Sequence, residues 1–379
     1  MDLETPLPGK NVCLVSWIRQ EDLKAKKLAD SITFNGIIQD LTEGGYSCSY
    51  LYEGEFGHIG FFMNLFWKFK EKRGSPNSPI SQHPVLSNLF SLFLTFYSLA
   101  SYRFKRDVKR KLGTFDVIVV AGPALMHPIH RAFKNSKYLV LYELNIEAEL
   151  FAFNNKGMKT FVNNTILNLI KITEMKALQL SNRILTTSPR DSNSLKKLFP
   201  MKEVDYYYPF YKREVTSVAR RPLKITDRNR QIDLVLEDKH TVIGFIASCS
   251  TVNCRALSGI VSIAKRVNSQ TVIFAIVGNI YSCSCVGDMP TNMVFTGFLD
   301  NPDDLMQNCD AFILFDVQPT GIEVKAQSYR LYNKPVLVIS EYQDSNYLPF
   351  LGNRMIECKD SDEAIKVIYK LAEKKLIGN

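Results

Sequence analysis

The amino-acid sequence predicts an α/β protein with two domains, each built around a parallel β-sheet. Short apolar runs alternate along the chain with longer segments of helical periodicity, which is typical of strand–helix–strand units. The chain has 379 residues, of which 46% are hydrophobic, so it is long enough to bury two cores. A charged stretch without periodicity, at 211–240, separates the two alternating halves and predicts an interdomain linker.

Six apolar runs in the first half predict strands, and segments with helical periodicity lie between them. Strands that alternate with helices pair in parallel, so 1–210 is predicted to form one domain. The predicted strands are 11–16, 47–52, 116–120, 138–142, 183–186 and 204–208, and the predicted helices lie within 23–43, 59–110, 161–180 and 192–198.

The second half, from 241 to 360, repeats this alternation. Strands are predicted at 242–247, 272–277, 294–297 and 311–315, with a helix at 255–267 between the first two. A further helix follows Thr320-Gly321 and ends before Asn333. Glu363 stands three residues after Asp360, which predicts a capping box at the start of a terminal helix within 361–379.

The net charge of +9 is concentrated after two apolar stretches. Six Lys or Arg residues lie within 103–111 and four within 68–73, each group following aromatic and aliphatic residues. The run 84–102 contains too many Ser, Thr and Asn residues to span a membrane. A packed core helix and an in-plane membrane helix both remain open for it. Basic residues beside apolar ones predict an anionic membrane surface as a partner, and no nucleic-acid-binding module is present.

The eight cysteines are scattered, and no signal peptide precedes the first strand, so a reduced, cytoplasmic protein is expected. Cys283-Ser-Cys285 has no second Cys or His pair at zinc-ligand spacing. Neither a metal nor a cofactor is predicted.

The segment 294–339 carries a recognisable motif series. It reads VFTGFLDNPDDLMQNCDAFILFDVQPTGIEVKAQSYRLYNKPVLVI and resembles the C-terminal domain of GT-B glycosyltransferases of family 4. The segment 181–199, SNRILTTSPRDSNSLKKLF, is similar to the end of that family's N-terminal domain. The positions in register with the family pattern are Gly297, Cys309-Asp310, Thr320-Gly321-Ile322, Lys325 and Lys334-Pro335-Val336.

This resemblance implies the GT-B fold, in which two Rossmann-like domains face each other across a cleft. The domain 1–210 would bind the acceptor, 241–360 would bind a nucleotide sugar, and the helix within 361–379 would return toward the first domain. The family's carboxylate pair falls on Thr320 and Ser328, so this chain departs from the pattern there.

The donor-binding prediction centres on the turn that follows the strand 311–315. Backbone N–H groups at a helix start bind phosphate well, and Gly321 permits close approach of the backbone. Lys325 adds a positive charge. A glycine at a turn and a surface lysine are also common without any ligand, so this alternative stays open. The predicted donor-binding residues are Gly321, Ile322, Lys325, Thr320, Ser328 and Arg255.

The catalytic prediction falls on the end of the strand 138–142, where ligands of open α/β sheets bind. Glu143, Asn145 and Glu147 resemble the family's Asp-x-His-Asn-x-Glu segment, in which Leu144 here replaces the His. The alternative is that these acids only favour a helix dipole. His127 is a fourth candidate, although a single loop histidine is often structural.

The resemblance therefore predicts a hexosyltransferase-type glycosyltransferase. It would move a sugar from a nucleotide-sugar donor to a lipid-linked or glycan acceptor at the membrane surface, with retention and without metal. The degenerate positions favour an alternative, a catalytically silent GT-B partner or scaffold of a glycan-assembly complex. A sugar-nucleotide epimerase of the same fold is a third possibility.

Overall fold

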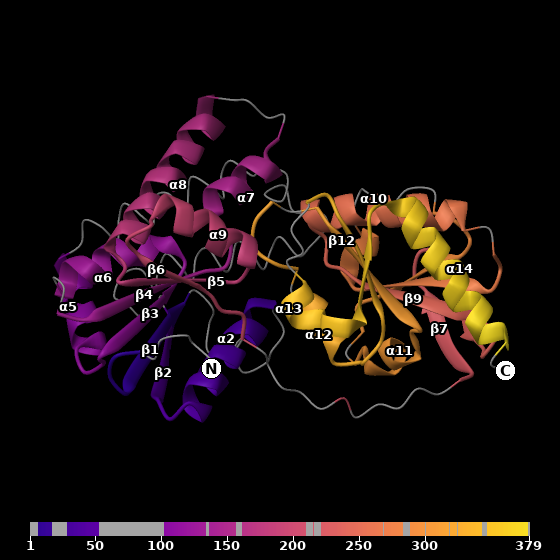
Figure 1. Cartoon of the computed structure of the whole chain (residues 1–379), viewed down its shortest axis with the longest axis horizontal. Coiled ribbons are helices and arrows are strands. Elements are labelled where there is room, and N and C mark those ends of the chain that lie inside the picture. Colours follow the sequence, from indigo (N-terminus) through magenta and orange to yellow (C-terminus); the bar gives the residue numbers. More distant parts are fainter. Residues whose placement is uncertain are drawn as a thin grey trace. The chain divides into compact units, whose positions relative to one another are not determined.

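The structure is a computed structural model with two compact units (Figure 1). The first unit contains 1–212 and the short segment 319–322, and the second contains 213–318 and 323–379. The structure describes residues 7–16, 29–52, 102–133, 136–156, 161–209, 215, 221–267, 269–282, 289–299, 301–317, 319–323, 325–342 and 347–377.

The first unit contains a six-stranded parallel sheet in the order β2-β1-β3-β4-β5-β6. Successive residues of β1 point to opposite faces: Val12 and Leu14 join one apolar cluster, and Cys13 and Val15 join the other. Both faces are therefore buried, which explains why the strands read as continuous apolar runs. The strands are β1 (Asn11–Ser16), β2 (Ser47–Tyr52), β3 (Val117–Ala121), β4 (Tyr138–Glu143), β5 (Arg183–Thr186) and β6 (Glu203–Tyr206).

Helices cover the two faces of this sheet. The helix α2 packs with the Val12 side, while α5, α6 and α8 contribute residues to the cluster on the Cys13 side. The helix predicted at 192–198 begins three residues earlier, at Pro189, where the Ser188 hydroxyl caps it by accepting the Asp191 N–H at 3.0 Å. The helices are α2 (Ala29–Glu43), α5 (Tyr102–Leu112), α6 (Met126–Phe133), α7 (Glu147–Asn154), α8 (Phe161–Leu180) and α9 (Pro189–Leu198), with a 3-10 turn at Pro123–Leu125.

The second unit contains another six-stranded parallel sheet, in the order β11-β10-β9-β12-β13-β14. Its strands are β9 (Thr241–Ile246), β10 (Val272–Val277), β11 (Met293–Gly297), β12 (Ala311–Asp316), β13 (Val336–Ser340) and β14 (Met355–Cys358). The helices are α10 (Thr251–Arg266), α11 (Asp303–Asn308), α12 (Lys325–Arg330), α13 (Leu348–Leu351) and α14 (Ser361–Ile377). Two parallel six-stranded sheets with helices confirm the predicted fold class.

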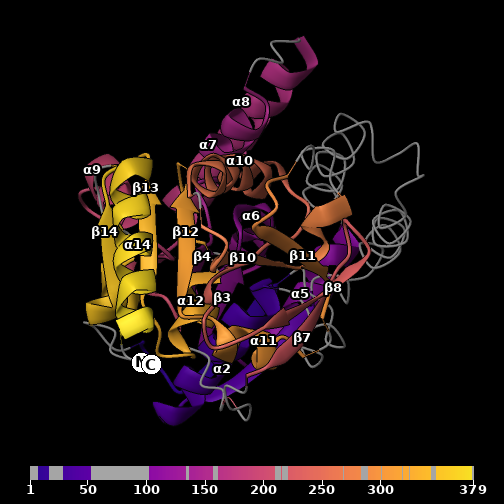
Figure 2. The same cartoon turned by 90° about the vertical axis from the view of Figure 1, so that its right-hand side faces the viewer.

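One feature of the second unit differs from the sequence prediction. The expected linker 211–240 contains an antiparallel hairpin of β7 (Leu223–Asp227) and β8 (Ile232–Leu236), which packs on β11 through β7. The helix α14 packs along α10, β13 and β14 of the second unit (Figure 2), and its return toward the first domain stays a prediction. The capping residue predicted for α14 is confirmed, because Asp360 accepts the Glu363 N–H at 2.9 Å. Glu363 accepts the N–H of Lys359 at 2.9 Å, so the reciprocal bond reaches the residue before the cap.

The sequence also predicted that the cysteines are reduced and that two apolar stretches contact a membrane. Cys249 and Cys254 are disulfide-bonded, so the prediction of reduced cysteines is wrong at these two positions. Disulfides are typical of oxidising compartments, so these two cysteines do not support the predicted cytoplasmic location. That location stays a prediction. Cys283 and Cys285, and the apolar stretches 61–69 and 84–101, lie outside the described residues. Among the helices that the structure describes, none has both the length and the apolar run needed to cross a membrane.

Candidate functional site

The strand order of the second sheet reverses between β9 and β12, which lie side by side. The chain leaves β9 toward β10 on one side and leaves β12 toward β13 on the other. In open α/β sheets, ligands bind in the crevice at the carboxyl ends of the strands beside such a switch point. The loops that follow β9 and β12 are therefore the candidate ligand-binding region of the second unit.

Lys325 connects these two loops. It is the first residue of α12, and its side chain is only 8% exposed. Its ammonium donates to Asn253 Oδ1 at 2.6 Å, lies 3.0 Å from Glu323 Oε2, and lies 4.5 Å from the ring centroid of Phe245 on β9. Asn253 is itself fixed in the first turn of α10, because its N–H donates to the capping hydroxyl of Ser250. A buried cation is thus held at the switch point.

Two carboxylates lie at the same edge of the sheet. Asp316 ends β12 and accepts hydrogen bonds from the Tyr347 hydroxyl at 3.2 Å and from the Ser340 hydroxyl at 3.0 Å. The Tyr347 hydroxyl also accepts the Glu323 N–H at 3.4 Å. Burial and the two carboxylates raise the pKa of Tyr347, so its hydroxyl remains a donor. Among the described residues, Glu323 Oε1 is buried and has no hydrogen-bond partner.

In the first unit, acidic side chains gather at the carboxyl end of β4. Glu143 is the last residue of β4 and is 2% exposed, and Glu174 of α8 accepts the N–H of Glu147 at the start of α7. Burial and the neighbouring carboxylates Glu174 and Glu147 raise the pKa of Glu143 well above its usual range. These effects favour the protonated form of Glu143, and Glu174 accepts the N–H at the start of α7.

The segment 319–322 is held by a carboxylate from α9. Asp191 Oδ2 accepts the Gly321 N–H at 2.7 Å and the Thr320 hydroxyl at 3.0 Å. The Thr320 oxygen in turn accepts the Ile146 N–H at 2.6 Å. Burial raises the pKa of Asp191, although the Gly321 N–H and the Thr320 hydroxyl favour its charged form. The Gly321 N–H, which the sequence analysis assigned to a phosphate, is bound by this carboxylate.

Gly321 also contacts Asn145 closely. Its φ of 73° is unfavourable for other residues, and a Cβ there would lie 2.0 Å from Asn145 Oδ1 and 2.8 Å from the Leu144 oxygen. The prediction that Thr320-Gly321 opens the following helix is wrong, because α12 begins at Lys325. A glycine is therefore required at position 321, because the backbone has a positive φ and packs directly on Asn145.

The remaining predicted residues lie elsewhere in their units. His127 is half-buried in the first turn of α6, and burial together with the nearby Lys176 and Arg131 lowers its pKa, so it is neutral near pH 7. Arg255 lies half-buried on α10, Ser328 half-buried on α12, and Ile322 is buried.

The structure thus brings the predicted residues together in two groups. Asn145 meets Thr320 and Gly321 in the first unit, near Glu143 and Glu147, while Lys325 lies at the switch point of the second. Sequence reasoning missed Asn253, Asp191 and Glu174, and it assigned no role to Glu323. The available signals were Ser250 with Asn253 and Ser188 with Asp191, each three residues apart, a capping pattern that places the second residue in the first turn of a helix.

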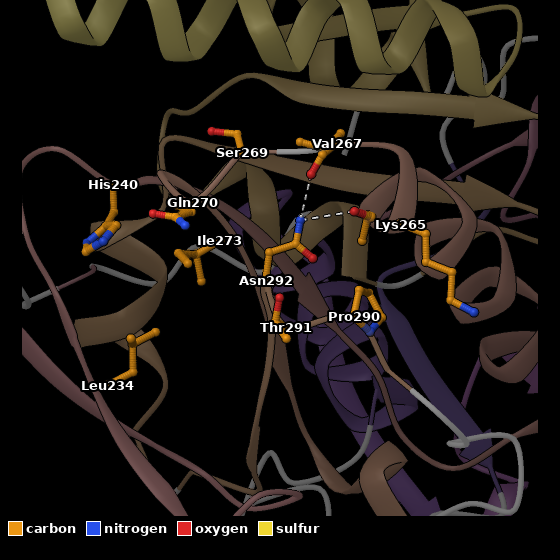
Figure 3. A pocket seen from close by; sticks show the side chains of 11 residues that line it. Leu234, His240, Lys265, Val267, Ser269, Gln270, Ile273, Pro290, Thr291 and Asn292 are labelled. Carbon is orange, nitrogen blue, oxygen red and sulfur yellow. Dashed lines mark hydrogen bonds between the residues drawn. The ribbon is translucent and has the colours of Figure 1, made fainter.

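A pocket of about 440 Å³ lies at the opposite, amino edge of the second sheet (Figure 3). Asn292 extends into the region between α10 and the start of β11, and its Nδ2 donates to the carbonyl oxygens of Ala264 and Val267 at the end of α10. This side chain therefore satisfies a helix end. His240 and Lys265 also line the pocket, which is distant in the fold from the carboxyl-edge residues described above.

No protein-family model matches the sequence. No curated protein matches it. Among solved structures, HepE from Anabaena in complex with UDP is similar, with a TM-score of 0.52, 12% identity, and coverage of 97% of this chain and 90% of that chain. TarM of S. aureus has a TM-score of 0.48 and 11% identity, and the match spans 72% of this chain but only 52% of that chain. The glycosyltransferase SnogD from Streptomyces nogalater has a TM-score of 0.38 and 14% identity, with coverage of 97% and 95%.

Two Rossmann-like units with parallel six-stranded sheets, and the likeness to HepE over nearly the whole chain, place this protein in the GT-B fold class. At 12% identity the likeness concerns the fold, and any activity must be argued from the residues.

Proposed function

We propose that this protein is a glycosyltransferase that uses a nucleotide sugar as donor. The observation that carries the proposal is the buried Lys325 at the β9–β12 switch point, in a fold shared with a UDP-bound HepE structure. A positive charge there offsets the negative charge that a leaving nucleoside diphosphate gains. As the resemblance implies, transfer would retain the anomeric configuration and need no metal.

The proposed donor site lies in the second unit. Lys325 supplies the charge, and Arg255 and Ser328 on the neighbouring helices are proposed to contact the nucleotide. Thr320, Gly321 and Ile322 stay part of the proposal on the resemblance alone, because Asp191 already binds the first two. A phosphate at Gly321 would have to replace that carboxylate.

The proposed acceptor site lies at the carboxyl end of β4 in the first unit. Burial raises the pKa of Glu143 and lowers that of His127, which favours a neutral carboxyl group as hydrogen-bond donor and a neutral imidazole as proton acceptor. Asn145 and Glu147 add polar groups at the start of α7. These side chains suit the hydroxyl groups of a sugar or glycan acceptor.

A lipid-linked acceptor would require contact with a membrane. Exposed Arg106, Lys109 and Arg110 on α5 support an anionic surface as partner. Ile172 and Met175 on α8 are 63% and 41% exposed and offer apolar contacts. We propose peripheral attachment through the apolar stretches 61–69 and 85–102 with their basic tails, one of which continues on α5.

The test is a thermal-shift panel of nucleotide sugars that covers the common bases and hexoses. A ligand at 100 times its dissociation constant stabilises the protein by about 2.7 kcal/mol. Lys325→Ala should weaken binding by about 1.5 to 3 kcal/mol, since a charge-assisted contact is lost. Lys265→Ala, at the amino-edge pocket, is the matched control and should bind like wild type. Equal binding by both variants would remove Lys325 from the site.

A specific observation also favours the second candidate, a catalytically silent partner of a glycan-assembly complex. The two groups best suited to bind phosphate are both paired with internal carboxylates, Lys325 with Glu323 and the Gly321 N–H with Asp191. Wild-type protein that binds no nucleotide sugar of the panel, yet co-purifies with an active transferase, would support this candidate.

A further inference from the structure

The hydrogen-bonding capacity of the Lys325–Glu323 pair is used unequally. A lysine ammonium has three N–H donors, and Lys325 has three partners: Asn253 Oδ1, Glu323 Oε2 and the face of the Phe245 ring. The carboxylate of Glu323 has two oxygens. Oε2 faces Lys325, whereas within the described part of the chain Oε1 has no donor. At the switch point, the unused hydrogen-bond acceptor is therefore Glu323 Oε1.

An unpaired buried acceptor is unusual. Glu323 is 7% exposed, and a buried carboxylate oxygen without a donor loses the hydrogen bonds that it makes in water. Native structures contain few such atoms, and each asks for an explanation such as a functional role, a water molecule or an ion. Lys325 fixes the other oxygen at 3.0 Å, and the Tyr347 hydroxyl accepts the Glu323 N–H, so the orientation of this acceptor is set in advance.

We propose that Glu323 Oε1 accepts a hydrogen bond from a ring hydroxyl of the ligand at the β9–β12 crevice. This rests on the proposed function, and the hydroxyl belongs either to the ribose or to the sugar of a nucleotide sugar. Both rings carry neighbouring hydroxyl groups, which suit a fixed carboxylate acceptor. Lys325 is then a positioning residue for Glu323 as well as a source of positive charge.

Glu323 thereby gives the site specificity for a hydroxylated ring. A site built to bind a hydroxyl group rejects the analogue that lacks it, because the polar group of the protein is left unpaired. The acid stands five residues before Ser328, on the loop side of α12, which is why a fixed motif spacing does not find it.

The experiment measures binding of hydroxyl-deleted analogues by calorimetry. The probes are the tightest-binding nucleotide sugar of the panel, its 2′-deoxy and 3′-deoxy ribose forms, and the forms that lack single hydroxyls on the sugar. For wild-type protein, one analogue should bind at least about tenfold more weakly than the parent. The ring that carries this sensitive hydroxyl identifies the source.

The same pair of ligands is then measured with Glu323→Leu combined with Lys325→Met. Replacing both members of a buried ion pair by apolar residues of similar size usually preserves folding, whereas removing one member leaves a buried charge. The parent will bind more weakly because Lys325 is lost, but the ratio between the two ligands should fall to within about threefold. Glu323→Gln should give an intermediate ratio. Glu341→Gln, which removes an exposed acid after β13, should keep the wild-type ratio.

Three other results are possible, and each contradicts either the role of Glu323 or the proposed function. If no hydroxyl deletion weakens binding to wild type, a water molecule or nothing completes Oε1, and the inference is wrong. If the ratio stays at its wild-type value in the double variant, another residue binds the hydroxyl. If wild-type protein binds no nucleotide sugar at all, the proposed function fails together with the inference.

Discussion

Asp310 belongs to the motif series of the second unit, and its contacts predict a structural role. Its carboxylate accepts hydrogen bonds from Arg221 Nη2 at 3.0 Å, from the Val242 N–H at 2.8 Å, and from Lys375 Nζ at 2.6 and 2.7 Å. It therefore joins the segment before β7, the start of β9 and the end of α14. Asp310→Ala should therefore weaken the attachment of all three segments to one another.

The expected loss of stability depends on how deeply the ion pairs of Asp310 are buried. Breaking a buried ion pair by removing one partner costs about 3 to 5 kcal/mol. The side chains of Arg221, Lys375 and Asp310 are 8%, 19% and 26% exposed, so water replaces part of the loss. We expect a loss of about 2 to 3 kcal/mol for the second unit, which corresponds to amide exchange about 30 to 150 times faster in its core strands.

Hydrogen exchange followed by mass spectrometry is the assay, since it reports each unit separately. Peptides from β9 and α14 should exchange faster in Asp310→Ala, while peptides from β4 in the first unit provide an internal control. The matched variant is Asp233→Ala, which breaks an exposed pair with Lys224 and should exchange like wild type. Unchanged exchange in β9 after removal of Asp310 would refute the reasoning.

Three further predictions concern the first unit. Glu147→Gln should lower sugar transfer by about 10- to 1000-fold without changing the melting temperature, measured with a radiolabelled nucleotide sugar and a membrane lipid fraction; full activity would remove this residue from the site. Glu143 has a pKa raised above 4.5, so its folded form binds more protons than its unfolded form, and its contribution to stability is lost as pH rises. Glu143→Gln should therefore melt at a higher temperature than wild type by a margin that grows from pH 5 to pH 8, and a margin independent of pH would contradict this. Liposome binding should require anionic lipid, fall as salt rises, and weaken when Arg106, Lys109 and Arg110 are changed to Ala, whereas binding that ignores lipid charge and salt would refute membrane attachment through α5.

Much of the fold can be predicted from the sequence because both faces of each sheet are buried. The strands β3 and β12 read as unbroken apolar runs, and this pattern identified them. The strand β14 has only one fully buried residue, Cys358, and the hairpin of β7 and β8 lies in a charged stretch. An apolar pattern carries little signal at such half-exposed strands.

The site was predicted only in part because its contacts join distant positions. Lys325 and Gly321 were predicted as site residues from local motif spacing, and this stays a prediction. Asn253 is 72 residues from Lys325, and Asp191 is 129 residues from Thr320. A single sequence contains no signal for such pairs, since each partner looks like an ordinary polar residue near a helix start. The pairing of Glu323 with Lys325 is local, but it becomes informative only when burial shows which oxygen lacks a donor.

The central claim is that a nucleotide sugar binds at the carboxyl edge of the second sheet. Photolabelling with 5-azido-UDP-glucose, followed by peptide mapping, tests it most directly, with unlabelled nucleotide sugar as competitor. The account predicts saturable labelling of peptides that contain 245–255 or 325–332, beside Phe245, Asn253 and Lys325. Saturable labelling confined to the amino-edge pocket, in peptides around Lys265 or Asn292, or no competable labelling with any azido-nucleotide sugar of the panel, would contradict it.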